Sequence, residues 1–243
     1  MEEKTCKHHT CYQKTRKTPM IKNNRKIEKI ELVVFDMDGV LADTLSSWKH
    51  VHDYFNTSNE ESVEKYLQGE IDDLEFIKRD VSLWKKNNKP IKKEKLEKIL
   101  KNIPIMKGAK ETTSFLKKHD IKTAIISAGL DILAERIAKE LSIDYVFANG
   151  VKTDEKGFLT TNGILKVQLK HKEKTVLKLS KQLNIPLNNI VTIGNSCFDT
   201  PMFQVTGLSI AFNPEDKCVQ EAADYVIEEK NLLKTIDILK TYI

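Results

Sequence analysis

Two aspartates separated by one residue follow the first strongly apolar run of the chain. The run at 32–35 is rich in β-branched and aromatic residues, as in a short buried strand, and Asp36, Asp38 and Gly39 come directly after it. In a parallel sheet, reactive groups lie just beyond the carboxyl ends of the strands. Two close carboxylates repel each other unless a cation or a shared proton separates them, and Mg²⁺ prefers oxygen ligands. The pair therefore indicates a magnesium site, although a strand end followed by a polar turn has the same local sequence.

Other reactive groups follow later in the chain. Ser127 lies between an expected strand end and a helix start, where its hydroxyl and the next amides can bind an anion. A plain helix cap is the simpler local interpretation of this serine. A lysine-rich run occupies 170–174, and the polar segment 194–199 follows another expected strand.

The elements that must position these groups alternate between strand and helix after residue 108. Turn residues between 149 and 168 (Asn149-Gly150, Glu155 to Gly157, Asn162-Gly163) indicate one or two hairpins. Alternating strands and helices imply an α/β fold with a doubly wound, mostly parallel sheet. Helices are expected at 109–119, 131–140, after 174, at 215–222 and at 231–240, and strands at 121–127, 145–148, 189–193, 208–212 and 225–227.

Residues 43–120 show helical periodicity and no strand signal. The first helix can be capped by Asp43 or Thr44, and further amphipathic runs precede and follow Gly69 and Pro90. We interpret 45–104 as a small helical cap inserted into a core made of 30–44 and 105–243. The aromatic residues Trp48, Phe55 and Trp84 are expected to form the core of this cap.

The net charge of +5 comes from the start of the chain. Residues 1–29 carry a net charge of +6, and the remaining residues are close to neutral at −1. We therefore predict a basic, disordered tail at 1–29 and do not expect a nucleic-acid partner for the folded part. No apolar run approaches the length that a membrane span needs.

The four cysteines, Cys6, Cys11, Cys197 and Cys218, are few and scattered, which favours a reducing compartment. The start of the chain also lacks the apolar core of a signal peptide, so we expect a cytoplasmic location. Cys6 and Cys11 flank two histidines, but the spacing is loose for a zinc site and we assign no metal there.

Taken in order, the motifs resemble those of the haloacid dehalogenase-like superfamily, and more narrowly its phosphoserine-phosphatase-like branch, including archaeal members. The resemblance runs from about residue 31 to the end of the chain. It rests on Asp36-x-Asp38, on Ser127, on a lysine near 172, and on Gly194-Asn195 followed by Asp199.

The resemblance implies a phosphatase with a Rossmann-like core. Asp36 would form an aspartyl-phosphate, and Asp38 would protonate the leaving oxygen and later deprotonate water. Mg²⁺ would be held by Asp36, Asp38 and Asn195, with Asp199 either as a replacement ligand or as a support behind the ligands. Ser127, Ala128 and Gly129 would bind the phosphate, with Lys172 balancing its charge; Lys170 and Lys174 are the alternatives, because the register of this run is uncertain.

The chain departs from the family pattern in two places. Asn195 stands where the motif normally has an aspartate, so we expect weaker Mg²⁺ binding, which Asn195→Asp should strengthen. In the cap, Leu45 and Asp80 align with the acidic residue and the arginine that bind phosphoserine. A carboxylate at 80 would repel a substrate carboxylate, and Arg79 could replace the arginine only if the helix register shifts.

The sequence therefore leaves a choice of functions. We favour a Mg²⁺-dependent phosphatase acting on a small phosphate monoester. A true phosphoserine phosphatase, and a weakened or inactive relative that binds a ligand or a partner, are the alternatives. Carbon–halogen hydrolysis fits less well, because a halide leaving group does not need the proton of Asp38. The oligomeric state is left open.

Overall fold

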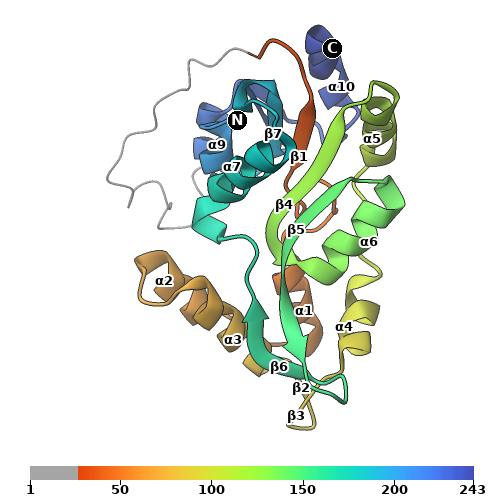
Figure 1. Ribbon diagram of the computed structural model, residues 1–243. Coiled ribbons are helices and arrows are strands. Elements are labelled where there is room, and N and C mark those ends of the chain that lie inside the picture. The colour runs from red at the N-terminus through yellow and green to blue at the C-terminus, as the bar shows by residue number, and fades with distance from the viewer. Residues whose placement is uncertain (1–26) are drawn as a thin grey trace.

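The computed structural model describes residues 27–243, so Cys6 and Cys11, to which we assign no metal, and nearly all of the predicted tail lie outside the described residues. A seven-stranded sheet in the order β6-β5-β4-β1-β7-β8-β9 forms the centre of the fold (Figure 1). Neighbouring strands are parallel except β5 and β6, which confirms the predicted mostly parallel α/β fold. The strands are β1 (Leu32–Phe35), β4 (Lys122–Leu130), β5 (Tyr145–Thr153), β6 (Leu159–Ile164), β7 (Ile190–Gly194), β8 (Leu208–Phe212) and β9 (Tyr225–Ile227).

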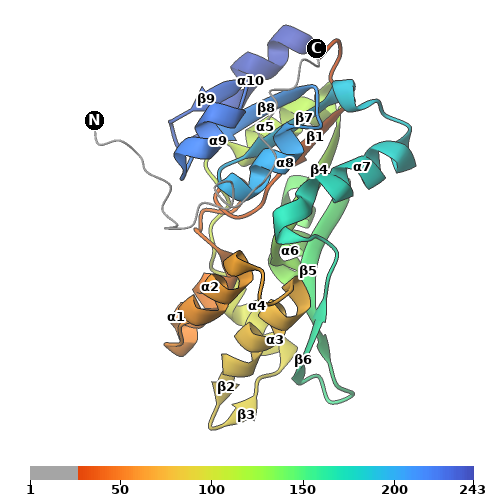
Figure 2. The same ribbon diagram turned by 90° about the vertical axis from the view of Figure 1, so that its left-hand side faces the viewer.

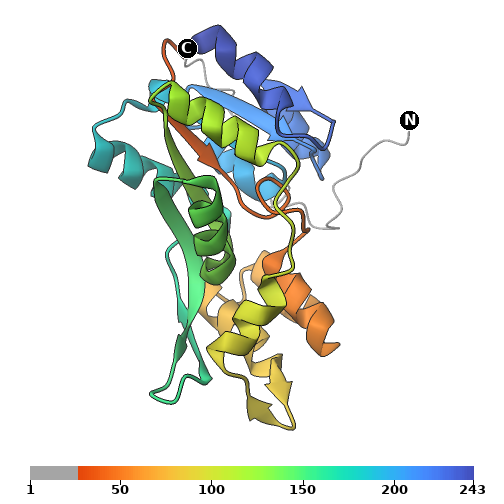
Figure 3. The same cartoon turned by 90° about the vertical axis from the view of Figure 1, so that its right-hand side faces the viewer.

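Helices cover both faces of the sheet. In β1, Leu32 and Val34 belong to one apolar cluster, and Val33 and Phe35 belong to another. Helices α7, α8 and α9 lie over the first of these faces (Figure 2), and α5, α6 and α10 lie over the second (Figure 3). A central strand buried on both sides must be apolar throughout, which explains the uninterrupted run at 32–35. The helices are α5 (Ala109–Lys118), α6 (Asp131–Leu141), α7 (Lys172–Leu183), α8 (Thr200–Phe203), α9 (Lys217–Ala222) and α10 (Lys234–Leu239).

A second, mainly helical layer lies between β1 and β4 in the sequence and below the sheet in Figure 1. The hairpin of β5 and β6 runs alongside α3, and Gly163 permits the close approach, because an added Cβ would lie 2.9 Å from Ile77 Cγ2. The N–H of Leu159 also donates to the carbonyl of Ile91 at 2.8 Å. Strands from beyond residue 104 thus complete this layer, and the cap boundaries at 45–104 stay a prediction. Its elements are α1 (Ser47–Phe55), α2 (Glu60–Gln68), α3 (Asp73–Leu83), β2 (Lys85–Lys86), β3 (Lys89–Pro90) and α4 (Lys93–Leu100).

The short ladder of β2 and β3 contradicts the expectation of no strand between 43 and 120. Asn87 and Asn88 connect these strands with φ angles of 51° and 59°. Asparagine tolerates positive φ, so the pair can form a tight hairpin turn. Each strand has two residues, which is too short for a periodic pattern to reveal.

One hairpin, not two, occupies 149–168. Two of the predicted turns lie within strands, since Asn149-Gly150 belongs to β5 and Asn162-Gly163 to β6. Asn149 is buried, and its Oδ1 accepts hydrogen bonds from the N–H groups of Lys166 and Val167 at 2.9 Å each. Its amide thus ties β5 to the chain after β6 instead of forming a turn. Among the described residues, no helix combines the length and apolar character needed to cross a membrane.

Candidate active site

The loop after β1 brings the two predicted aspartates to the carboxyl end of the central strand. Asp36 follows β1 directly, and its N–H donates to the carbonyl of Ile193 in β7 at 2.9 Å. Gly39 turns the chain with a φ of 78°, and a Cβ at this position would lie 2.1 Å from Asn195 Nδ2. Glycine is therefore required here both by the backbone angle and by the approach of the β7 loop.

Lys172 is the lysine that reaches this site. It is buried at the start of α7, and its Nζ lies 3.0 Å from Asp36 Oδ1 and 2.7 Å from Asp199 Oδ1. The two alternatives point elsewhere: Lys170 donates to the carbonyl of Tyr66 at 2.5 Å, and Lys174 donates to the side chain of Gln168. Helical geometry separates the three side chains, which the sequence alone did not distinguish.

Asp199 organises the loop after β7. Its Oδ1 accepts from Lys172, and its Oδ2 accepts from the backbone N–H groups of Asn195 at 2.9 Å and Ser196 at 3.0 Å. The Ser196 hydroxyl also donates to Oδ2 at 3.2 Å. Both oxygens of this buried carboxylate are engaged, and an ammonium already lies beside one of them. These contacts disfavour the predicted role of Asp199 as a metal ligand and indicate that it positions Lys172.

Asn195 has a partner that the sequence analysis did not identify. The Asn195 side-chain amide donates to Glu215 Oε1 at 3.2 Å, and the Glu215 N–H donates to the Asn195 carbonyl at 2.8 Å. This arrangement uses the Nδ2 end of the amide and leaves Oδ1 as the end that can face a cation. Glu215 follows β8, so its nearness to the β7 loop depends on strand order and has no local sequence signal.

Ser47 is a second residue that sequence reasoning missed. Its N–H and its hydroxyl both donate to Asp38 Oδ2 at 2.9 Å, and its Oγ accepts from the N–H of Leu130 at 3.0 Å. The helix N-cap is Ser46, which accepts from Lys49, so the prediction of Asp43 or Thr44 as the cap is wrong. The pair of serines before the amphipathic run was the signal that could have identified this helix start.

Ser127 lies on the other side of Asp38, in the last part of β4. The side chain is buried, and its Oγ accepts from the N–H of Gly129 at 3.1 Å. A Cβ on Gly129 would lie 2.7 Å from Asp38 Oδ2, so the segment 127–129 sits directly against the aspartate. The carbonyl of Ala128 accepts from the indole of Trp48 at 2.9 Å. Trp48 therefore connects the helical layer to the sheet as well as packing against Trp84, with ring centroids 5.4 Å apart.

Burial dominates the electrostatics of the site. It raises the pKa of Asp36 to about 7, reinforced by the Asp199 charge and opposed by Lys172. Burial also raises the pKa of Asp38, against the two hydrogen bonds from Ser47. For Lys172, burial acts to lower the pKa, but the carboxylates of Asp199 and Asp36 outweigh it and raise that pKa above its usual value. A lysine that stays charged among acids that resist ionisation is typical of a functional site.

These groups share one cavity of about 420 Å³ between the sheet and the helical layer. The predicted residues Asp36, Asp38, Ser127, Ala128, Gly129, Lys172 and Asn195 all line it. Asp199 lies behind them, joined to Lys172. Arg79 does not line the cavity, and its Nε pairs with Glu75 at 3.2 Å. The structure therefore does not place Arg79 where it could bind a substrate, because the α3 register that was observed turns it away.

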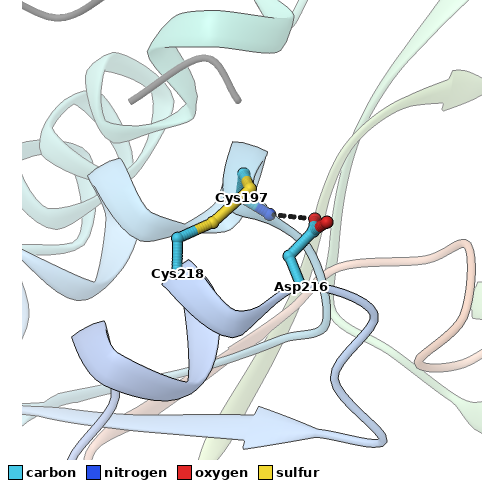
Figure 4. A group of neighbouring side chains, drawn as sticks. All are labelled: Cys197, Asp216 and Cys218. Atoms are coloured by element: carbon cyan, nitrogen blue, oxygen red, sulfur yellow. Dashed lines mark hydrogen bonds between the residues drawn. A yellow bond between two sulfur atoms is a disulfide. The ribbon is translucent and has the colours of Figure 1, made fainter. Parts of the chain in front are cut away.

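A disulfide joins the β7 loop to α9 (Figure 4). Cys197 and Cys218 form this bond, and the Cys197 N–H donates to Asp216 at 3.0 Å. These three residues also make up a buried group of metal-ligand types whose ligand atoms lie within 4.8 Å of one another. With the sulfurs bonded to each other, the group holds the loop in place. From the scattered spacing of the cysteines we expected both of these residues to be reduced, and the disulfide contradicts this expectation.

Comparison with known proteins agrees with this geometry. The family model of the haloacid dehalogenase-like hydrolases matches residues 30–207. Phosphoserine phosphatase of Methanocaldococcus jannaschii is 31% identical over 88% of this chain and 99% of its own length. Phosphoserine phosphatase of Archaeoglobus fulgidus is 32% identical over 86% of this chain, which spans 60% of that relative.

A solved substrate-bound phosphoserine phosphatase has a TM-score of 0.74 and 28% identity, covering 87% of this chain and 99% of that one. A phospho-aspartyl intermediate analogue of phosphoserine phosphatase has a TM-score of 0.73 at 28% identity, with the same coverage. The family match covers most of the chain and includes the loops that carry Asp36, Ser127, Lys172 and Asn195. The chain therefore belongs to the haloacid dehalogenase-like hydrolases, and it is a phosphatase of that family.

Proposed function

We propose that this phosphatase hydrolyses a small phosphate monoester through a phosphorylated Asp36, with Mg²⁺ as its cofactor. The observation that carries the proposal is the contact of the Lys172 ammonium with Asp36 at 3.0 Å, with the half-buried Asp38 lining the same cavity. A nucleophile, a fixed positive charge and a proton donor are the groups that phosphoryl transfer to a carboxylate requires. A solved relative named as a phospho-aspartyl intermediate analogue supports the same chemistry.

The donor set fits a hard cation. Asp36 Oδ1 is buried beside the Lys172 ammonium, 3.0 Å away, and Asp38 Oδ1 is buried without a hydrogen bond among the described residues. We assign a carboxylate oxygen of Asp36, the backbone carbonyl of Asp38 and the Asn195 side-chain oxygen as the groups that would hold Mg²⁺, since oxygen ligands suit this ion. When bound, the ion would screen the repulsion between the carboxylate and the phosphate.

The reaction uses Asp36 and Asp38 in turn. A carboxylate oxygen of Asp36 attacks phosphorus while the bond to the alcohol oxygen breaks, and Lys172 balances the charge of the transferring oxygens. Ser47 directs both of its donors to Oδ2 of Asp38, which leaves Oδ1 to carry the proton for the leaving alcohol. Asp38 then takes a proton from water, whose oxygen attacks phosphorus, and Asp36 is regenerated as phosphate leaves. Ser127 would orient the phosphate by a hydrogen bond from its hydroxyl.

True phosphoserine phosphatase activity is the second candidate, because the curated relatives carry that name. Two residues of the cavity wall disfavour phosphoserine as the substrate. Leu45 has no charge to offer a substrate amine, and Asp80 lines the cavity where a substrate carboxylate would need a cation.

A cytoplasmic location stays a prediction. It was based partly on the expectation of reduced cysteines, and the Cys197–Cys218 disulfide weakens that part of the argument.

Phosphate release from a panel of monoesters, with Mg²⁺ and with EDTA, tests the proposal. Asp36→Asn should lower kcat by at least roughly a thousandfold, because the nucleophile is lost. Acid-quenched wild-type protein should retain labelled phosphate, and the variant should not. Asp120→Asn is the matched control, since this exposed aspartate has a φ of 55° that asparagine tolerates. Equal turnover by wild type and Asp36→Asn would refute the mechanism, and no turnover of any ester would favour an inactive binding protein.

A further inference from the structure

Part of the cavity wall is a stripe of residues from α2 and α3. Helix α3 contributes Asp73, Phe76, Ile77 and Asp80, at the spacing that puts side chains on one helix face. The residues from α2 are apolar or aromatic: Val63, Tyr66 and Leu67. If the proposed function holds, this wall contacts the alcohol part of the ester, so its charge decides which alcohols fit.

Asp80 is a buried carboxylate on this wall, with a relative exposure of 3%. Its two oxygens accept from the Asn59 side-chain amide at 3.0 and 3.1 Å. His52 Nε2 lies 3.5 Å from Asp80 Oδ1 without forming a hydrogen bond. No lysine or arginine among residues 27–243 lies within ion-pairing distance of Asp80.

The contacts of His52 define its tautomer. The indole N–H of Trp84 lies 3.4 Å from His52 Nδ1, and the Thr57 hydroxyl lies 2.8 Å from the same atom. An indole N–H can only donate, so Nδ1 must be the accepting nitrogen. The other ring nitrogen, Nε2, is the one that faces Asp80. Among residues 27–243, the amide of Asn59 and the imidazole of His52 are thus the polar side chains beside the Asp80 carboxylate, and no lysine or arginine pairs with it.

Other charges on this side of the cavity are already matched. Lys49 pairs with Asp53 at 2.6 Å, and Arg79 pairs with Glu75 outside the cavity. Asp73 accepts from the Tyr66 hydroxyl at 3.0 Å and interacts electrostatically with Lys170. An alcohol with a carboxylate would meet uncompensated negative charge here, whereas an ammonium group would meet a partner.

We propose that the cavity selects phosphate monoesters of amino alcohols that lack a carboxylate, with Asp80 binding the ammonium group. The stacked rings of Tyr66 and Phe76, with centroids 5.1 Å apart, supply the apolar surface for the carbon chain of such an alcohol. The hydrolysis of such esters rests on the proposed function. The binding of an ammonium group by Asp80 does not, because it depends only on the residues that line the cavity.

Matched esters test this selection. Aminoethyl phosphate and hydroxyethyl phosphate differ by the ammonium group, and aminoethyl phosphate and phosphoserine differ by a carboxylate. We expect kcat/KM for aminoethyl phosphate to exceed both others by roughly tenfold or more, since an unscreened charge at short range has at least this effect. In Asp80→Asn the advantage over hydroxyethyl phosphate should fall to near unity, mainly through KM. Asp72→Asn, at the exposed N-cap of the same helix, is the matched control.

Two results would overturn the inference: phosphoserine as the best of the three esters, or an aminoethyl preference that survives in Asp80→Asn. An equal loss of kcat for all esters in Asp80→Asn would show a structural role only and would also count against it. Calorimetric binding of aminopropyl phosphonate and propyl phosphonate separates this inference from the proposed function. If no ester is hydrolysed, tighter and Asp80-dependent binding of the amino compound still supports the selection, and equal affinities refute it.

Discussion

Two buried aspartates, Asp36 and Asp199, contact a buried lysine at this site, and the half-buried Asp38 lies beside them. Asp199 is fully hydrogen-bonded and paired with Lys172, whereas Asp36 shares the same ammonium through Oδ1 and Asp38 Oδ1 makes no hydrogen bond in the described structure. Buried charges are costly unless they are paired, so an excess of carboxylates is a feature that a bound cation would stabilise. Each side chain thus has a distinct environment, and the differences agree with the distinct roles proposed for them.

The environment of Asn195 changes the expected result of replacing it. Asn195→Asp alone would set a second carboxylate against Glu215, because the present amide donates to Glu215 at 3.2 Å. We therefore expect little gain in Mg²⁺ affinity from this variant, in contrast to the expectation from the motif alone. Asn195→Asp combined with Glu215→Gln restores a hydrogen-bond donor and adds a ligand charge. This double variant should lower the Mg²⁺ concentration for half-maximal activity by roughly tenfold.

Titration of activity and of binding heat with Mg²⁺ measures the effect. Glu215→Gln alone is the control, and it should not lower the Mg²⁺ requirement, because it adds no charge at position 195. A double variant with the wild-type requirement would mean that the residue at 195 does not contact the ion.

Elements far apart in sequence meet at the carboxyl end of the sheet. The first turn of α1 reaches the sheet through Ser47 and Trp48, which bind Asp38 and the carbonyl of Ala128. The loop after β7 is held from the other side by α9, through Cys197 and Cys218. The loops that carry the proposed catalytic residues are thus positioned by neighbouring elements more than by their own sequences.

The disulfide between the β7 loop and α9 predicts a redox-dependent stability. It closes a loop with a sequence separation of 21 residues. A loop of this size corresponds to about 3 kcal/mol of stabilisation in the chain-entropy view. Reductant should therefore lower the free energy of unfolding of the wild-type protein by up to that amount, as measured by denaturant titration. Cys218→Ser should resemble the reduced protein and show no response to reductant. A wild-type protein that is equally insensitive would argue that the bond does not form in solution.

At the scale of the whole molecule, a sheet covered on both faces carries a second layer over one end. The cavity of about 420 Å³ lies between the two, so it exists only when both are folded. The carboxylates that line it are desolvated by folding, and their protonation therefore enters the stability of the entire chain.

The pH dependence of unfolding follows from Asp36. Its pKa is about 7 in the folded protein and near 3.8 in a free side chain, so the native state binds the proton more strongly. The contribution of Asp36 to stability is therefore present at low pH and is lost as pH rises from about 4 to about 7. In EDTA, wild-type stability should fall relative to Asp36→Asn across this range, by a few kcal/mol at most. The measurement is denaturant unfolding at a series of pH values.

Addition of Mg²⁺ should act in the opposite direction. The cation would bind the ionised carboxylate, so it should stabilise the wild-type protein more at high pH than at low pH. If the free energy of unfolding of wild type and of Asp36→Asn varied with pH in the same way, the raised pKa of Asp36 in the folded protein would be contradicted.

The sequence by itself determined the fold class and most of the site. Apolar runs and helical periodicity are local, so strands such as 208–212 and 225–227 and their alternation with helices could be predicted from short windows. Asp36, Asp38 and Ser127 could be identified because each directly follows, or ends, a predicted strand. Their meeting at one edge follows from parallel topology alone.

Only the tertiary structure decided which side chains complete the site. The choice of Lys172 over its neighbours, the contact of Ser47 with Asp38 and that of Glu215 with Asn195 join segments whose distance depends on packing and strand order. The surroundings of Asp80 likewise come from different parts of the helical layer, since Asn59 precedes α2 and His52 belongs to α1. Such contacts join surfaces that become neighbours only on folding, so a local sequence pattern does not predict them.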